Sequence, residues 1–381
     1  MKRGKPDFWL IFLTFLLLGI GLVMVFSASY FNGYTDPDIN DSYYFFKKQA
    51  IYALIGLILF FTVSNIPYHT YRKWVGPILL ISLILLILVN VIGLVRNGAQ
   101  RWLGYGAISF QPSEFVKLGM IIYMSSIMVK KQPVLHQFRR GLLPPLIILF
   151  LVLGLLMLQP HFSATVIIMG ICFTIIFCAG ARLKHLFLLA LSGLPILISV
   201  MLLGDYRVDR IQSMLNPLSD PTGDGYQIMQ SLMAIGPGGL TGVGLGRSIQ
   251  KLAYLPESHT DFIFSIIAEE LGFIGGVILI ALFVLLIIRG ILIAIQAPDQ
   301  FGTLMATGIV TLIAIESIFN LGVVTALLPV TGVPLPLISY GGTALVFKLV
   351  SLGILLNISR YRNVKSKVKP SSPAIRDPVQ G

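Results

Sequence analysis

Long apolar segments are the feature that most constrains the fold of this chain. From Phe262 to Ile288 nearly every residue is apolar, which is long enough to cross the hydrocarbon core of a bilayer. A chain inside lipid must satisfy its own backbone hydrogen bonds, so a segment of this kind crosses as a helix. Only 12% of the residues are charged, against about 25% in soluble domains. We therefore expect an all-α integral membrane protein.

Hydropathy predicts ten transmembrane helices. The predicted spans lie near 8–28, 49–66, 76–95, 114–130, 142–158, 162–181, 185–203, 262–288, 302–322 and 342–359. Residues 1–360 would form one polytopic membrane domain, and its longest loop, 204–261, would join the seventh and eighth helices. Residues 361–381 are polar and basic, so we expect a disordered cytoplasmic tail.

The basic residues predict the orientation of the chain. The net charge is +12, but the Lys and Arg residues lie between apolar segments, so we expect no nucleic-acid partner. Most of the 28 Lys and Arg residues fall on the side that carries both termini. The positive-inside rule then places both termini in the cytoplasm and the loop 204–261 outside.

Asp261 is the acid whose position is most suggestive. It is predicted to lie on the first turn of the eighth helix, at the membrane surface, where the helix dipole favours the ionised form. Glu269 would share its face about 12 Å deeper, and Glu270 would point away. An acid within a span faces a cavity or a partner. The alternative makes Asp261 a helix cap and the two glutamates members of structural ion pairs, and these residues alone leave both open.

A second acid and a lysine open the fourth predicted span. Glu114 and Lys117 are three residues apart on one helix face and can pair. Lys117 is too deep to be free, so the two residues form either a structural ion pair or a contact with substrate. Glu316 and Lys348, in the ninth and tenth predicted spans, are expected to pair with each other or with Asn320.

Cations and an aromatic residue are predicted on the outer side. Arg207 and Arg210 follow the seventh predicted span, where guanidinium groups can bind a lipid phosphate, although mixed charge is also typical of a solvated loop. Trp102, beside Arg101, is either an anchor at the membrane interface or a platform that stacks on a sugar. The Gly-dense run 236–246 is either a flexible re-entrant loop or a backbone cradle for phosphate.

No metal motif of the Cys-X-X-Cys or His-Glu-X-X-His type is present in the sequence. His259 and Glu257, close to Asp261, could hold a divalent cation loosely. We therefore predict no certain cofactor and leave Mg²⁺ or Mn²⁺ open.

The sequence resembles the FtsW/RodA/SpoVE family of bacterial wall synthases over about residues 8–360. The matching segments are Gly98–Leu103, Gln111–Glu114, Gly223–Gln227, Gln230–Ser231, Gly236–Gly239, Leu255–Phe264, Glu269–Gly272, Leu328–Gly332, Pro334–Pro336 and Ser339–Gly342. The segment Gly246–Lys251 looks more like the FtsW/SpoVE branch. The chain departs from the family at Gln159–Thr165, where His161 replaces the usual aspartate.

The resemblance implies a peptidoglycan glycosyltransferase with ten spans that polymerises lipid II at the outer face of the bacterial cytoplasmic membrane, in cell division or sporulation. It also implies that the aspartate matching Asp261 is essential to catalysis and that the tryptophan matching Trp102 is important. The implied partners are a class B penicillin-binding protein, which is a transpeptidase, and other divisome proteins.

The residues fit this chemistry independently. Asp261 is placed to act as general base on a sugar hydroxyl of a membrane-anchored acceptor. The leaving pyrophosphate needs cations, and Glu114 and Glu269 would hold those cations from behind. The expected substrate-binding residues are Arg101, Trp102, Glu114, Lys117, Arg207, Arg210, His259 and Glu269. A lipid II flippase and a non-catalytic divisome scaffold remain as alternatives.

Overall fold

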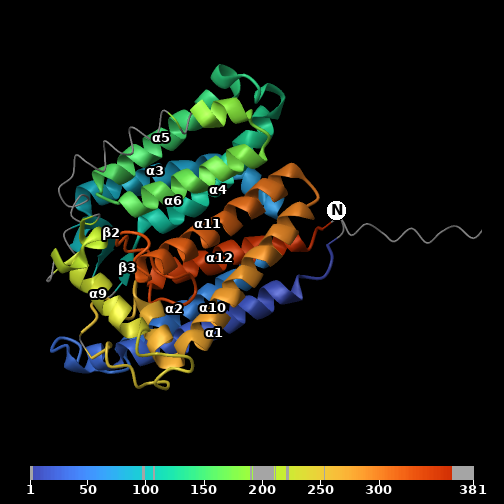
Figure 1. Ribbon diagram of the computed structural model, residues 1–381. Helices are drawn as coiled ribbons and strands as arrows, with labels where there is room; N and C mark the ends of the chain where they lie inside the picture. The colour runs from blue at the N-terminus through green and yellow to red at the C-terminus, as the bar shows by residue number, and fades with distance from the viewer. Residues whose placement is uncertain are drawn as a thin grey trace, which may run out of the picture.

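A computed structural model describes residues 3–96, 99–105, 108–188, 191, 210, 212–219, 223–252 and 254–362. The described chain forms a bundle of long helices packed side by side (Figure 1). The helices are α1 (Phe8–Thr35), α2 (Tyr44–Asn65), α3 (Val75–Ile92), α4 (Pro112–Lys131), α5 (Leu143–Leu158), α6 (Phe162–Cys178), α9 (Asp224–Ile235), α10 (Ile263–Ile295), α11 (Gln300–Val324) and α12 (Gly342–Ser359). Short helical turns cover Tyr68–Lys73, Gln132–Val134, Phe138–Leu142 and Pro217–Ser219.

The described helices confirm a multi-pass membrane protein. Seven of them are long and apolar enough to cross a bilayer: α1, α2, α3, α5 together with the turn before it, α10, α11 and α12. Helix α6 is apolar but shorter, and α4, at the fourth predicted span, carries charged residues at both ends. The seventh predicted span, 185–203, and much of the loop 204–261 lie outside the described residues. The count of ten and the position of the long loop therefore stay predictions.

The expectation of an all-α fold was wrong for residues 94–110. They form a three-stranded antiparallel sheet, in the order β1 (Leu94–Arg96), β2 (Ala99–Tyr105) and β3 (Ile108–Phe110). In the register, Leu94 lies opposite Trp102, and Leu103 lies opposite Phe110. Hydropathy detects spans and not short polar hairpins, because a strand of three residues has too few positions to display an alternating pattern.

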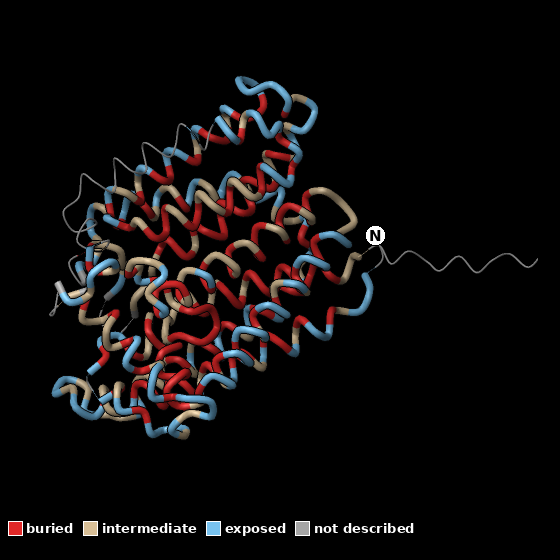
Figure 2. Tube along the Cα trace, viewed as in Figure 1, coloured by how far each residue is buried: buried red, intermediate tan, exposed pale blue. Residues whose placement is uncertain are grey.

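The core of the bundle contains buried polar and charged side chains as well as apolar ones. Helix α4 is buried along most of its length and packs against α3, α6, α11 and α12. Buried residues run through the middle of the bundle, and exposed ones lie on its outside (Figure 2). Many exposed residues of α2, α3 and α10 are large and apolar, which suits contact with lipid.

Both described ends of the chain lie at one end of the bundle. The backbone N–H of Gly4 donates to the carbonyl oxygen of Arg360 over 2.7 Å. Asp7 caps α1 and is held by Arg289, with 2.6 Å between its Oδ2 and Nη2 of Arg289, and by Arg362. The small sheet and α9 lie at the opposite end (Figure 1).

Helix α10 is broken at Gly272, whose φ of 68° and ψ of −169° are not helical. The Gly-dense run replaces the missing helical hydrogen bonds. The N–H groups of Val243 and Gly244 donate to the carbonyls of Glu269 and Glu270, both over 3.0 Å. The carbonyls of Gly239 and Leu240 accept from Phe273 and Ile274 over 2.9 and 3.1 Å.

The fit of the Gly-dense run against α10 depends on the absence of side chains. A β-carbon on Gly242 would stand 2.1 Å from the carbonyl oxygen of Glu270. The backbone N–H groups of Val243 and Gly244, which could have cradled a phosphate, are used by the helix. The run is therefore a structural insert in α10.

Candidate functional site

Asp261 lies in a turn before α10, two residues ahead of Ile263, and not on the first helical turn as expected. The turn begins at Glu257, whose φ of 53° is left-handed and whose carbonyl accepts from the N–H groups of Thr260 and Phe262. This turn continues to Phe262, so the helix begins at Ile263 and does not include Asp261. The amide of Asn320, on α11, donates to the carbonyl of Asp261 over 2.7 Å.

The segment Val330–Pro334 faces Asp261. The same Asn320 amide donates to the carbonyl of Val333 over 2.9 Å, so one side chain ties the turn and the segment together. Gly332 has a φ of 66°, and a β-carbon placed on it would lie 3.5 Å from Oδ2 of Asp261. Arg210 donates to the carbonyl of Val330 over 2.6 Å, and Ser163 donates to the carbonyl of Thr331.

The electrostatics of Asp261 differ from the expectation based on a helix dipole. Burial, followed by the negative charge of Glu257, raises the pKa of Asp261 to about 7, against the opposing effect of Arg210 and Arg101. The half-buried carboxylate lies ahead of the helix and not on its first turn. Its removal from water therefore affects its pKa more than the helix dipole does. A group with a pKa near the working pH is suited to accept a proton in a reaction.

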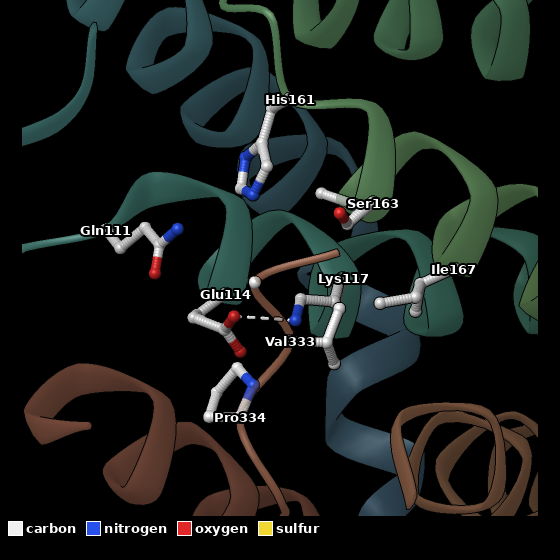
Figure 3. A pocket seen from close by; sticks show the side chains of 10 residues that line it. Gln111, Glu114, Lys117, His161, Ser163, Ile167, Val333 and Pro334 are labelled. Atoms are coloured by element: carbon white, nitrogen blue, oxygen red, sulfur yellow. Dashed lines mark ion pairs between the residues drawn. The ribbon is translucent and has the colours of Figure 1, made fainter. Parts of the chain in front are cut away.

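A polar cavity adjoins Asp261 at Gly332. It lies between α4, α6 and the segment Val330–Pro334 (Figure 3). Its lining residues are Gln111, Glu114, Lys117, His161, Ser163, Ala164, Ile167, Gly332, Val333 and Pro334. Gly332 contributes to the wall, and a β-carbon placed on it would lie 3.5 Å from Oδ2 of Asp261, so the cavity adjoins the carboxylate at this residue.

Below the cavity, two acids and two lysines form a closed cluster. Lys117 lies 2.6 Å from both Glu114 and Glu316, and Lys348 lies 3.1 and 2.8 Å from the same two acids. Both predicted ion pairs, Glu114–Lys117 and Glu316–Lys348, are confirmed. All four side chains are buried, and each charge is matched within the cluster, as a buried ion in a membrane protein requires.

The remaining cations lie nearer to Asp261. Arg101, on β2, donates to the carbonyl of Pro160, and its positive charge lowers the pKa of Asp261. Trp102 is the next residue on the strand, so its side chain leaves from the opposite face of the sheet. Arg210 approaches from the long loop. Arg207 lies outside the described residues.

His259 and Glu269 do not contact the cavity wall as expected of substrate ligands. The ring of His259 packs on Phe45 and Tyr340, with ring centroids 4.5 and 5.5 Å apart, and burial lowers its pKa. Glu269 accepts from the hydroxyl of Ser248 and from the N–H of Ile249. The expectation that Glu269 holds the cations of the site is wrong, because its carboxylate binds Ser248 and Ile249 instead.

Glu270 forms a structural ion pair, as the alternative expected, whereas Glu269 is held by neutral donors. The carboxylate of Glu270 lies 2.7 Å from the ammonium of Lys251 and accepts from the hydroxyl of Ser27, on α1. The two adjacent acids therefore hold residues 248–251 against α1 and α10, which fixes the loop that leads to Asp261.

Four residues at the site were given no role there by the sequence analysis. Asn320 and Ser163 act through backbone carbonyls far away in sequence, which no local pattern reveals. Gly332 was part of a matching motif, but its contact with Asp261 depends on the path of a loop. His161 was noted only as a departure from the family, and it lines the cavity.

The donor set does not fit a dedicated metal site. In the part of the chain that the structure describes, no group of three or more His, Cys, Asp or Glu side chains is placed to hold a metal ion. Glu257 and Asp261 remain the acids nearest the site, and the ring of His259 is packed between aromatic rings. We derive no step through a metal, and the divalent cation stays a prediction.

Fold and site together define a class of protein. It is a multi-pass membrane protein with a polar cavity, an acid beside the cavity whose pKa is raised to about 7, and two arginines close to that acid. A family model described as cell cycle protein, FTSW_RODA_SPOVE, matches residues 8–364. The chain belongs to the FtsW/RodA/SpoVE family, as the resemblance predicted.

Two relatives place the chain near the FtsW and SpoVE members. Stage V sporulation protein E of Bacillus subtilis (strain 168) is 48% identical, covering 94% of this chain and 98% of that protein. The probable peptidoglycan glycosyltransferase FtsW of Trichlorobacter lovleyi is 42% identical, covering 94% of each.

Two solved structures share the fold. A chain of a peptidoglycan synthase complex, studied for the coordination of polymerization and crosslinking, matches with a TM-score of 0.76 and 30% identity, covering 94% of this chain and 99% of that one. The rod shape determining protein RodA of Thermus thermophilus matches with a TM-score of 0.70 and 30% identity, covering 94% and 98%.

Proposed function

We propose that this protein is a peptidoglycan glycosyltransferase of the bacterial cytoplasmic membrane that polymerises lipid II, with Asp261 as general base. The observation that carries the proposal is the placement of Asp261, a half-buried acid with a pKa of about 7 that adjoins a polar cavity. Relatives named as peptidoglycan glycosyltransferases support the same activity. Division and sporulation are both served within this family, and relatives of both kinds match the chain.

In the proposed reaction, Asp261 takes the proton from a sugar hydroxyl of the acceptor. The hydroxyl oxygen forms a bond to the anomeric carbon of the donor, while the bond from that carbon to the diphosphate oxygen breaks. The electron pair leaves with the lipid diphosphate. A carboxylate of this pKa is strong enough to accept the proton and is still ionised in half of the molecules at neutral pH.

The cations near Asp261 would stabilise the charge on the leaving diphosphate. Arg101 and Arg210 both act electrostatically on Asp261, so they lie on the side where the negative charge develops. Lys117 would stabilise the leaving diphosphate less than its sequence position suggested, because Glu114 and Glu316 already bind its ammonium group. Arg207 and Trp102 remain proposed contacts of the substrate.

The proposed location of the site is the outer face of the membrane, with both termini in the cytoplasm. The described ends of the chain lie together, opposite the end that carries the small sheet and α9, which supports an even number of crossings. The likeness to a chain of a peptidoglycan synthase complex supports a crosslinking partner. We propose a class B penicillin-binding protein, with other divisome proteins as further partners.

The test is polymerisation of lipid II in detergent by the purified protein with its partner, followed on a gel. Asp261→Asn keeps the size of the side chain and removes the base, so we expect a loss of about 10²–10⁴-fold with normal folding. Asp261→Glu tests whether a displaced carboxylate suffices. Asp41→Asn, which neutralises an exposed acid paired with Lys47, is the matched control.

The possible outcomes separate the proposal from its alternatives. Near-normal polymer from Asp261→Asn would remove the general-base role. A wild type that makes no polymer with any class B partner would reopen the flippase and scaffold readings. A flippase would then leave polymerisation by a separately supplied enzyme unchanged in detergent, where no bilayer needs to be crossed.

A further inference from the structure

The Gly-dense run, residues 236–246, has an exposed apolar surface that the proposed reaction does not use. Leu240 is 71% exposed and Leu245 is 56% exposed. From Leu232 to Gly246 no residue is charged, and Thr241 has the only side chain that can form a hydrogen bond. Large apolar side chains that gather on an exposed segment mark a surface that another apolar phase covers.

The exposed leucines continue the lipid-facing side of α10. The N–H groups of Phe273 and Ile274 donate to the carbonyls of Gly239 and Leu240 over 2.9 and 3.1 Å, so the run lies against the helix at these two residues. Exposed apolar side chains extend along the same helix face, at Phe273, Ile274, Val277 and Ile278. The apolar surface of the run and that of the membrane-crossing helix are therefore continuous.

The position of the run along α10 gives its level in the membrane. The part of α10 beyond the break at Gly272 is Phe273–Ile295, slightly longer than the roughly 20 residues that cross a hydrocarbon core. Phe273 therefore lies near the boundary between hydrocarbon and headgroups, and the run that bonds to it lies at the same level. Arg247, which is exposed, ends the uncharged stretch, and its long side chain can extend to the lipid headgroups.

The backbone of the run is prepared for an environment with few hydrogen-bond partners. The N–H groups of Val243 and Gly244 donate to carbonyls of α10, and the N–H of Gly242 donates to the carbonyl of Gly238 over 2.8 Å. Non-helical backbone is tolerated at membrane depth where protein satisfies it in this way. A protein partner fits less well, because protein interfaces have a polar rim and hydrogen-bonding side chains, and this stretch offers Thr241 alone.

We propose that residues 239–245 dip into the bilayer, with Leu240 and Leu245 in contact with the acyl chains of the leaflet on the side of α9. The occupant of this surface is lipid, and the run is a membrane contact within a segment that otherwise joins two spans. The inference is independent of the proposed reaction, since it rests on the exposed leucines and on their continuity with α10.

The test places one nitroxide spin label at a time on the full-length protein, with both native cysteines replaced by alanine. The test positions are Leu240→Cys and Leu245→Cys. Ile278→Cys, on the exposed apolar face of α10, is the matched control for contact with lipid. Asp38→Cys, in the exposed turn after α1, is the control for contact with water. Elution of each variant at the wild-type position in gel filtration shows that it is folded.

The labelled proteins are placed in nanodiscs of phosphatidylethanolamine and phosphatidylglycerol. Electron paramagnetic resonance then measures how often the label collides with oxygen, which concentrates in hydrocarbon, and with a nickel chelate, which stays in water. We expect the ratio of oxygen to nickel collisions at Leu240→Cys and Leu245→Cys to be close to that at Ile278→Cys and well above that at Asp38→Cys. If one leucine variant does not fold, the other decides.

Two results would overturn the inference. A ratio at either leucine that matches Asp38→Cys would place that side chain in water. Low collision rates with both reagents would show that protein covers the surface, either another part of this chain or a second copy. Neither result bears on catalysis, because polymerisation of lipid II is not measured, so failure of this inference is distinguishable from failure of the proposed function.

Discussion

Gly332 faces the carboxylate of Asp261 and also lines the polar cavity, since a β-carbon placed on it would lie 3.5 Å from Oδ2. This position is shared by the cavity and by the surroundings of the carboxylate, and it carries no side chain. If Asp261 acts as the proposed base, the acceptor hydroxyl would need this position to stay clear.

Gly332→Ala should lower polymerisation of lipid II by roughly tenfold or more, because a methyl group would occupy the space beside the carboxylate that the acceptor hydroxyl needs in the proposed reaction. The φ of 66° adds a cost of about 1–2 kcal/mol for any non-glycine residue. Gly180→Ala is the matched control, since its φ is 90° and nothing lies within 4 Å. We expect the two variants to lose Tm equally and Gly332→Ala to lose more activity than Gly180→Ala. Equal activities of the two variants would contradict the prediction.

The rate should depend on pH through Asp261. Burial and the charge of Glu257 raise its pKa to about 7, so the base is protonated at pH 6 and ionised at pH 8. We expect kcat/KM to rise with pH through a midpoint near 7 when proton transfer limits the rate. Asp261→Asn should abolish the rise along with the activity. A flat profile from pH 5 to 8 in the wild type would contradict the assignment.

The same shift affects stability in the opposite sense. A carboxyl with a raised pKa binds more protons in the folded state than in the unfolded state between about pH 4 and pH 7. The folded state therefore loses stability as the pH rises through this window. Asp261→Asn removes the loss, so its Tm should exceed that of the wild type at pH 8 and match it near pH 4.

Much of the fold could be predicted from the sequence, because a span in lipid has a length and a polarity that local composition reveals. The ion pairs Glu114–Lys117 and Glu316–Lys348 followed from the need to match buried charges. That the two pairs form one cluster could not be predicted, since it depends on how three helices meet. The position of Asp261 ahead of α10 was missed because the turn that begins at the left-handed Glu257 continues to Phe262, so the helix begins later than the apolar run indicates.

The site was harder to predict than the fold, and Glu269 illustrates why. Helical spacing placed it on the face of Asp261, but Asp261 is not helical, and Gly272 breaks α10 just beyond Glu269. The carboxylate instead accepts hydrogen bonds from Ser248 and Ile249, which lie 21 and 20 residues away in sequence and are brought to it by a loop. Periodicity cannot predict such a contact, because it assumes an unbroken helix.

Removing one lysine from the buried cluster should destabilise the protein strongly. Lys117→Met leaves Glu114 and Glu316 with Lys348 alone, and we expect a loss of about 3–5 kcal/mol. The double variant Lys117→Met with Glu114→Gln keeps the charges balanced and should recover part of that loss. Lys47→Met, which breaks the exposed pair with Asp41, should cost no more than about 1 kcal/mol. Unfolding in detergent would measure all three.

Arg101 and Trp102 leave β2 from opposite faces, so their variants should differ. Arg101→Ala should reduce polymerisation about 10- to 100-fold, the range for a lost hydrogen bond to a charged group, without reducing the yield of protein. Trp102→Ala should also reduce activity if the ring stacks on sugar. If Trp102 is an interface anchor, Trp102→Phe should be silent and Trp102→Ala should mainly lower the yield.

Reporter fusions should give the orientation of the bundle. A fusion at Gln230, on α9 near the end that carries Asp261, is expected to be external, and fusions at Leu135 and at position 375 are expected to be cytoplasmic. A cytoplasmic signal at Gln230 would place the catalytic acid on the wrong side for an outer-face polymerase.

The break at Gly272 separates the short first part of α10, which follows Asp261, from the longer part that can cross the bilayer. The piece from Phe273 to Ile295 is roughly 34 Å long by helix rise, longer than a hydrocarbon core of about 30 Å. A helix of this length adapts to a thinner or thicker membrane by tilting. An unbroken α10 would transmit each change of tilt to the turn before it. With the joint at Gly272 and the loop fastened by Glu269 and Glu270, we expect the height of Asp261 above the membrane to stay constant across lipids of different chain length.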